Sequence, residues 1–98
     1  MTELVQFIRR DIAPLTNPVP RALAHGFQMD TLAAPVAPGL VETMVAESLR
    51  VPAHVWRLAF DGLLRDDFSD ELHRIAAPTL LIHGERDGFV PAAHAQHL

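Results

Sequence analysis

One short apolar run, Thr79 to Ile82, constrains the fold of this chain more than any other feature. The run reads TLLI and lies between Pro78 and His83. A segment that is apolar on both faces is typical of a strand buried on both sides within a parallel sheet. Such a strand needs neighbouring strands, and no second segment of this kind occurs among the 98 residues. The sequence therefore predicts a strand without the rest of its sheet.

The first two thirds of the chain predict helices. Thr2 is a suitable N-cap for a first helix, and after a proline-rich connection a second helix is predicted from Pro20 to about Leu32. Two amphipathic stripes follow at helical spacing, from Leu40 to Leu49 and from Val55 to Leu64. Ser69 is predicted to cap a short helical turn before the apolar run.

Composition excludes several classes of function. The apolar fraction of 49% and the charged fraction of 20% exclude general disorder. A net charge of -4, with eight thinly spread basic residues, provides no cationic face for nucleic acid. Cysteine is absent, which excludes disulfides and thiolate metal sites and is usual in a reducing cytosol. With neither a signal peptide nor a membrane span expected, the sequence predicts a soluble cytoplasmic protein.

The segment LHRIAAPTLLIHGERDGFVP resembles the later part of an α/β-hydrolase. In that family a helical cap precedes a short helix, a PTL-x-I-x-G strand and a G-x-x-D-x-x-V-P turn that presents the acid of the catalytic triad. The sequence from Phe7 onward is similar to the cap of bacterial members, so the resemblance covers nearly the whole chain. The specific matches are Pro78, Thr79, Leu80, Ile82, Gly84, Asp87, Val90 and Pro91.

The resemblance implies an α/β fold class, as a partial α/β-hydrolase fold that is mostly helical cap plus one core strand and the following helix. Residues 1–68 would form the cap, and residues 69–98 a piece of the core with a strand at 79–83 and the acid turn at 84–91. Gly84 would permit a tight exit from the strand, and Pro91 would fit the first turn of the next helix.

The resemblance also implies a reaction for the parent protein. It would hydrolyse a carboxylic ester or related acyl substrate with a Ser-His-Asp triad and without a cofactor. Asp87 would be the triad acid, which orients a histidine and stabilises the imidazolium that forms. Without the flanking motif, an aspartate in this position would be interpreted as a turn-forming or helix-capping residue.

The other two members of the triad are missing from the sequence. The family's nucleophile lies on G-x-S-x-G, whereas Ser48 and Ser69 lack the flanking glycines and are predicted to be surface or capping serines. His94 and His97 follow the acid too closely to be the triad histidine, and His83 is interpreted as a packing residue. His94 and His97 share a helical face near Asp87, but further organised ligands are lacking, so no metal site is predicted. The chain alone is therefore predicted to be inactive.

Candidate substrate-binding residues come from the predicted cap. Phe27, Met29 and Trp56 are candidates for lining an acyl pocket, since such pockets are mostly apolar. The alternative is that they hold the helices together. We favour the core for Trp56 and Phe60, which belong to a regular stripe, whereas Phe27 and Met29 fit either interpretation.

Two further interpretations stay open. Haloperoxidases, enol-lactonases, dehalogenases and C–C hydrolases share the acid turn and cap, so the reaction could be any of these. The chain could instead be a non-catalytic helical binding module. Under the hydrolase interpretation the only predicted partner is the small acyl substrate of the parent protein. Because apolar stripes would lack the sheet that normally covers them, self-association of the chain is also expected.

Overall fold

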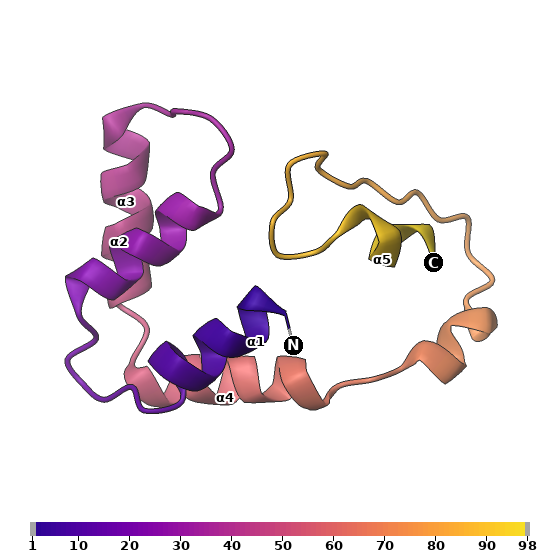
Figure 1. Cartoon of the computed structure of the whole chain (residues 1–98), viewed down its shortest axis with the longest axis horizontal. Helices are drawn as coiled ribbons and strands as arrows, with labels where there is room; N and C mark the ends of the chain where they lie inside the picture. Colours follow the sequence, from indigo (N-terminus) through magenta and orange to yellow (C-terminus); the bar gives the residue numbers. More distant parts are fainter. Residues whose placement is uncertain (1, 98) are drawn as a thin grey trace.

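The computed structural model describes residues 2–97, and every regular element in that range is helical (Figure 1). Most of the helical residues lie in the first two thirds of the chain. A long irregular segment then leads to one short terminal helix (Figure 1). In chain order the elements are α1 (Glu3–Phe7), the π-helix η1 (Ile8–Ile12), α2 (Arg21–Asp30), α3 (Pro38–Leu49), α4 (Ala53–Arg65), the 3-10 helix η2 (Ser69–Arg74) and α5 (Ala92–Gln96).

The predicted strand at 79–83 is wrong, and with it the α/β fold class. Residues 78–84 adopt no regular secondary structure, and the side chains of Leu80 and Ile82 are 82% and 88% exposed. The strand does not form because it lacks neighbouring strands in the described chain, as the sequence indicated. A strand forms through hydrogen bonds to a neighbour, and residues 2–97 contain no other strand that could provide them.

The four main helices were predicted within a few residues of their observed bounds. Thr2 is the N-cap of α1, because its Oγ1 accepts the backbone N–H of Val5 at 3.3 Å. The first helix differs from expectation in its second half, where the Ala13 N–H donates to the Ile8 carbonyl at 2.8 Å and widens the turn into η1. Ser69 was predicted as a cap but is instead the first residue of η2.

The core lies where η1 and the segment that follows it pack across α4. Two polar contacts hold the connection at residues 13–20, between η1 and α2, to α4. Asn17 Oδ1 accepts the N–H of Ala53 at 2.8 Å at the start of the helix, and Arg57 Nη1 donates to the Leu15 carbonyl. The buried residues of this cluster are Ile8, Ile12, Leu15, Val19, Ala53 and Trp56.

Helices α2 and α3 form a separate pair, seen crossing at one end of the molecule (Figure 1). Ala24 and Val45 are fully buried. Ser48 was predicted to be a surface residue, but it is only 9% exposed, and its Oγ accepts from Gln28 Nε2 at 2.8 Å. The same hydroxyl donates to the Met44 carbonyl, so a polar bridge between the helices explains its burial.

The irregular segment after η2 turns back toward the start of the chain (Figure 1). Its returning end touches α2 and the residues just beyond it. Arg86 Nη1 donates to the Ala33 carbonyl at 3.2 Å, and the rings of Phe89 and Phe27 have centroids 6.4 Å apart. Within the described part of the chain, none of the helices has the length and apolar character needed to span a bilayer.

We expect Ile12→Ala to lower the free energy of unfolding by about 2–5 kcal/mol, because Ile12 is completely buried and its loss leaves a cavity. Urea unfolding followed by far-UV circular dichroism measures the change. Leu58→Ala is the matched control, since Leu58 is mostly exposed and its loss is expected to change the value by less than about 0.5 kcal/mol. Equal effects of the two variants would contradict the assignment of the core.

We expect the double variant Leu80→Asn/Ile82→Asn to raise the dissociation constant for self-association at least about 100-fold, because burying each apolar side chain contributes about 1.5–3 kcal/mol. Sedimentation velocity over a range of concentrations measures this constant. Leu58→Asn serves as the comparison on the exposed face of α4. If Leu58→Asn alone disperses the oligomer, the interface is α4 and the prediction fails.

Candidate functional site

Asp87 closes the turn that leads from the exposed apolar segment to α5. Its backbone N–H donates to the Gly84 carbonyl at 3.2 Å. Its Oδ1 accepts two backbone N–H groups, from Phe89 and from Val90, each at 2.9 Å. Aspartate favours such turns because its short side chain reaches the backbone two and three residues ahead. One carboxylate oxygen is therefore committed to the turn.

His83 holds the same turn from its other side. Its Nε2 lies 2.7 Å from the Val90 carbonyl oxygen. A carbonyl only accepts hydrogen bonds, so Nε2 carries the hydrogen in this contact. The backbone of Val90 is thus bonded by two side chains, to Asp87 through its N–H and to His83 through its carbonyl. The interpretation of His83 as a packing residue missed this contact, although its half-buried position agrees with partial packing.

The pKa of Asp87 is lowered below its ordinary value. The backbone hydrogen bond from Val90 is the largest cause, that from Phe89 is the next, and the nearby charge of His83 adds a smaller effect in the same direction. These donors stabilise the ionised carboxylate. No residue between 2 and 97 hydrogen-bonds to the second oxygen, Oδ2. The site is therefore an ionised carboxylate with one oxygen fixed and the other available to accept a hydrogen bond.

Two expectations about the ends of this turn need correction. Gly84 does not have a positive φ, and an added Cβ would lie 4.0 Å from the Asp87 Cβ, which is ordinary contact. The turn therefore does not need glycine for conformational reasons. Pro91 is the N-cap of α5 instead of a residue of its first turn, and its carbonyl accepts the N–H of His94 at 2.9 Å.

The three predicted substrate-binding residues are only partly brought together. The rings of Phe27 and Trp56 meet edge to face with centroids 5.6 Å apart. Trp56 is 7% exposed and belongs to the core, as its stripe indicated. Met29 is 44% exposed and lines neither of the cavities next to the acid turn. Of these three residues, only Phe27 lines a cavity next to the acid turn.

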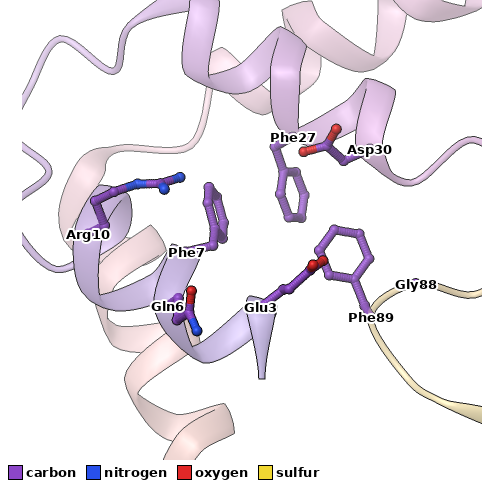
Figure 2. Close-up of a pocket in the computed structure, with 8 residues that line it drawn as sticks. All are labelled: Glu3, Gln6, Phe7, Arg10, Phe27, Asp30, Gly88 and Phe89. Carbon is purple, nitrogen blue, oxygen red and sulfur yellow. The ribbon is translucent and has the colours of Figure 1, made fainter. Parts of the chain in front are cut away.

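Two cavities flank the acid turn. A cleft of about 590 Å³ lies between the turn, including Asp87 itself, and residues 30–33 at the end of α2. Figure 2 shows the second cavity, of about 480 Å³, between α1, α2 and the loop at Gly88 and Phe89. Sequence reasoning missed the contribution of Glu3, Phe7, Asp30 and Phe89 to this cavity. Helical spacing gave no signal for it, because the lining residues come from three separate segments.

The serines and terminal histidines do not complete a catalytic site. The Ser48 hydroxyl is engaged between α2 and α3, and the Ser69 hydroxyl donates to Asp67. Neither serine lines the two cavities next to the acid turn. His94 and His97 lie exposed at the end of the described chain. Residues 2–97 contain no group of three His, Cys, Asp or Glu side chains arranged to hold a metal ion.

Comparison of the chain with protein-family models, with curated proteins and with solved structures finds no match. The resemblance to α/β-hydrolases therefore rests on the motif at 78–91 and stays a hypothesis. Any function of the site has to be argued from the geometry around Asp87 and the two cavities.

We expect the Asp87 carboxyl to titrate below the ordinary aspartate pKa of about 3.9. Since the pKa is lowered in the folded turn, its stabilising effect is complete above the ordinary value and is lost as the pH falls through the lowered one. The amide chemical shifts of Phe89 and Val90, followed by NMR from pH 7 to pH 2, measure this transition. Asp87→Asn is the control, because it keeps an acceptor oxygen and removes the titration.

Asp87→Ala removes both the acceptor and the charge, so the Phe89 and Val90 amide shifts of this variant are expected at neutral pH to resemble those of an open turn. Unchanged shifts in Asp87→Ala would show that the carboxylate does not hold the turn.

Proposed function

We propose that this chain supplies the triad acid and part of the substrate pocket of a serine hydrolase that resembles the α/β-hydrolases. The substrate is a carboxylic ester or a related acyl compound. The observation that carries the proposal is the carboxylate of Asp87, whose Oδ1 is fixed by the N–H groups of Phe89 and Val90 while Oδ2 is left available. The sequence motif at 78–91 supports it independently.

The role of Asp87 follows from this geometry. A triad acid has to stay ionised and hold one oxygen toward the Nδ1–H of a histidine, so that the other ring nitrogen can accept the proton of the nucleophilic serine. The serine oxygen then attacks the acyl carbon, the alcohol leaves, and water hydrolyses the acyl-enzyme. Two backbone donors lower the pKa of Asp87 and fix its rotamer, which suits that role.

The position of the large cleft supports an acyl substrate next to Asp87. The cleft of about 590 Å³ is within the size range of small-molecule sites, about 300–1,000 Å³. It runs from the acid turn to the end of α2, so the proposed cap and the proposed acid form opposite walls. A substrate there would have its reacting group close to the turn.

The serine and the histidine of the proposed triad have to come from outside the residues described here. Ser48 and Ser69 have hydroxyls that donate to other acceptors, and His83 uses Nε2 to hold Val90. The apolar side chains at 80–82 also require a covering surface that residues 2–97 do not provide. We therefore propose that the chain by itself does not hydrolyse esters and works only as part of a longer or assembled protein.

We expect the chain alone to hydrolyse p-nitrophenyl acetate no faster than the uncatalysed background. A protein that includes the flanking coding sequence is expected to hydrolyse it faster. In that longer protein Asp87→Asn is expected to lower kcat about 10⁴-fold with little change in KM, because the histidine loses the partner that fixes its tautomer. Asp70→Asn, a carboxylate outside both cavities, is the matched control.

Two results would contradict the hydrolase proposal. One is the absence of a G-x-S-x-G motif and of a later histidine from the translated flanking sequence. The other is a hydrolytic longer protein in which Asp87→Asn and Asp70→Asn have the same kcat.

A further inference from the structure

The smaller cavity has three aromatic walls from three parts of the chain. Phe7 comes from α1, Phe27 from α2, and Phe89 from the acid turn (Figure 2). The centroids of Phe7 and Phe27 are 5.9 Å apart with the rings nearly parallel, and those of Phe27 and Phe89 are 6.4 Å apart. Aromatic rings carry negative charge density on their faces, so they attract cations at close range.

Two carboxylates line the same cavity. Glu3 and Asp30 are both exposed (Figure 2). Neither side-chain carboxylate has a hydrogen bond or an ion pair with another residue between 2 and 97. Arg10 is the only cation that lines the cavity within this range. Its guanidinium is already paired with Asp11, with Nε and Nη2 at 2.9 and 2.6 Å from Oδ2. The charge available to a ligand is therefore negative.

We propose that this cavity binds a small organic cation, an ammonium group carried on an apolar or aromatic body. The three rings would contact the apolar body and attract the ammonium group, and Glu3 and Asp30 would pair with its charge. A volume of about 480 Å³ accommodates a molecule of that size. Anions are repelled by the carboxylates, and neutral molecules gain neither the charge pairing nor the full cation–π attraction.

This inference does not rest on the proposed hydrolysis. Asp87 does not line the aromatic cavity, and binding requires neither a serine nucleophile nor a histidine. The chain can therefore bind a cation whether or not a longer protein hydrolyses esters. If both proposals hold, the ligand lies directly next to the acid turn, because Gly88 and Phe89 line the cavity.

The chain contains its own reporter for binding. Trp56 is the only tryptophan, and its ring contacts Phe27, one wall of the cavity, with centroids 5.6 Å apart. A ligand that moves or covers Phe27 is expected to change the emission of Trp56. Binding can therefore be followed on the full chain without a label.

The test titrates the chain with three ligands that share one ring and differ in charge: benzylammonium, benzyl alcohol and benzoate. Trp56 emission, excited at 295 nm to avoid the ligands, is the readout, and isothermal titration calorimetry checks each value. Benzylammonium is expected to bind at least about 10-fold more tightly than benzyl alcohol, and benzoate more weakly than either. Equal affinity of benzylammonium and benzyl alcohol, or no binding of benzylammonium, overturns the proposal.

Variants with matched controls locate the site. Asp30→Asn and Phe89→Leu are each expected to weaken benzylammonium binding about 5-fold or more, since each removes one attraction for the cation. Asp70→Asn makes the same change in net charge outside the cavity, and Phe68→Leu removes an exposed ring outside it. Far-UV circular dichroism confirms that each variant keeps its helices. If the controls weaken binding as much as the cavity variants, the cation binds elsewhere and the proposal fails.

Discussion

The packing of η1 across α4 is the contact on which the other parts of the structure depend. Ile8 and Ile12 are buried together with Ala53 and Trp56, and their cluster contains six of the eight buried apolar residues in the described chain. Trp56 then contacts Phe27 of α2, which brings the α2–α3 pair to the core. The burial has a cost, because the indole N–H of Trp56 is buried without a hydrogen-bond partner in the described chain.

Phe27 connects this core to the acid turn. Its ring contacts Phe7, Trp56 and Phe60 on the side of the core and Phe89 on the side of the turn. The turn is itself shaped by local hydrogen bonds, which the Asp87 carboxylate accepts and the His83 ring donates, so its internal geometry does not depend on the helices. Its position does, because the Phe27–Phe89 contact and the bond from Arg86 to the Ala33 carbonyl attach it to α2 and to the residues just beyond that helix.

The exposed apolar residues show why the prediction of a strand at 79–83 failed. They also support the proposal that the chain works within a longer or assembled protein. The run at 80–82 has the composition of a buried strand, but a strand is stabilised by partners that lie elsewhere in sequence. Without them the same residues lie exposed in an irregular segment. Leu58 and Leu63 of α4 and Phe68 beyond it are likewise exposed, so the helices bury only part of the apolar surface that their stripes present.

The sequence by itself determined the features that depend on neighbouring residues: the helices at periodic apolar stripes, the N-cap at Thr2 and the turn around Asp87. Each is stabilised by contacts within a few positions. Spacing and residue type were therefore sufficient to predict the helices and the N-cap, whereas the turn at 84–91 was expected from the resemblance to the α/β-hydrolase motif. Only the tertiary structure decided that Ser48 is buried, that Met29 is exposed and that Phe7, Phe27 and Phe89 line one cavity. Those outcomes depend on how segments far apart in sequence pack together, and neither the period of a helix nor the chemistry of a turn contains that information.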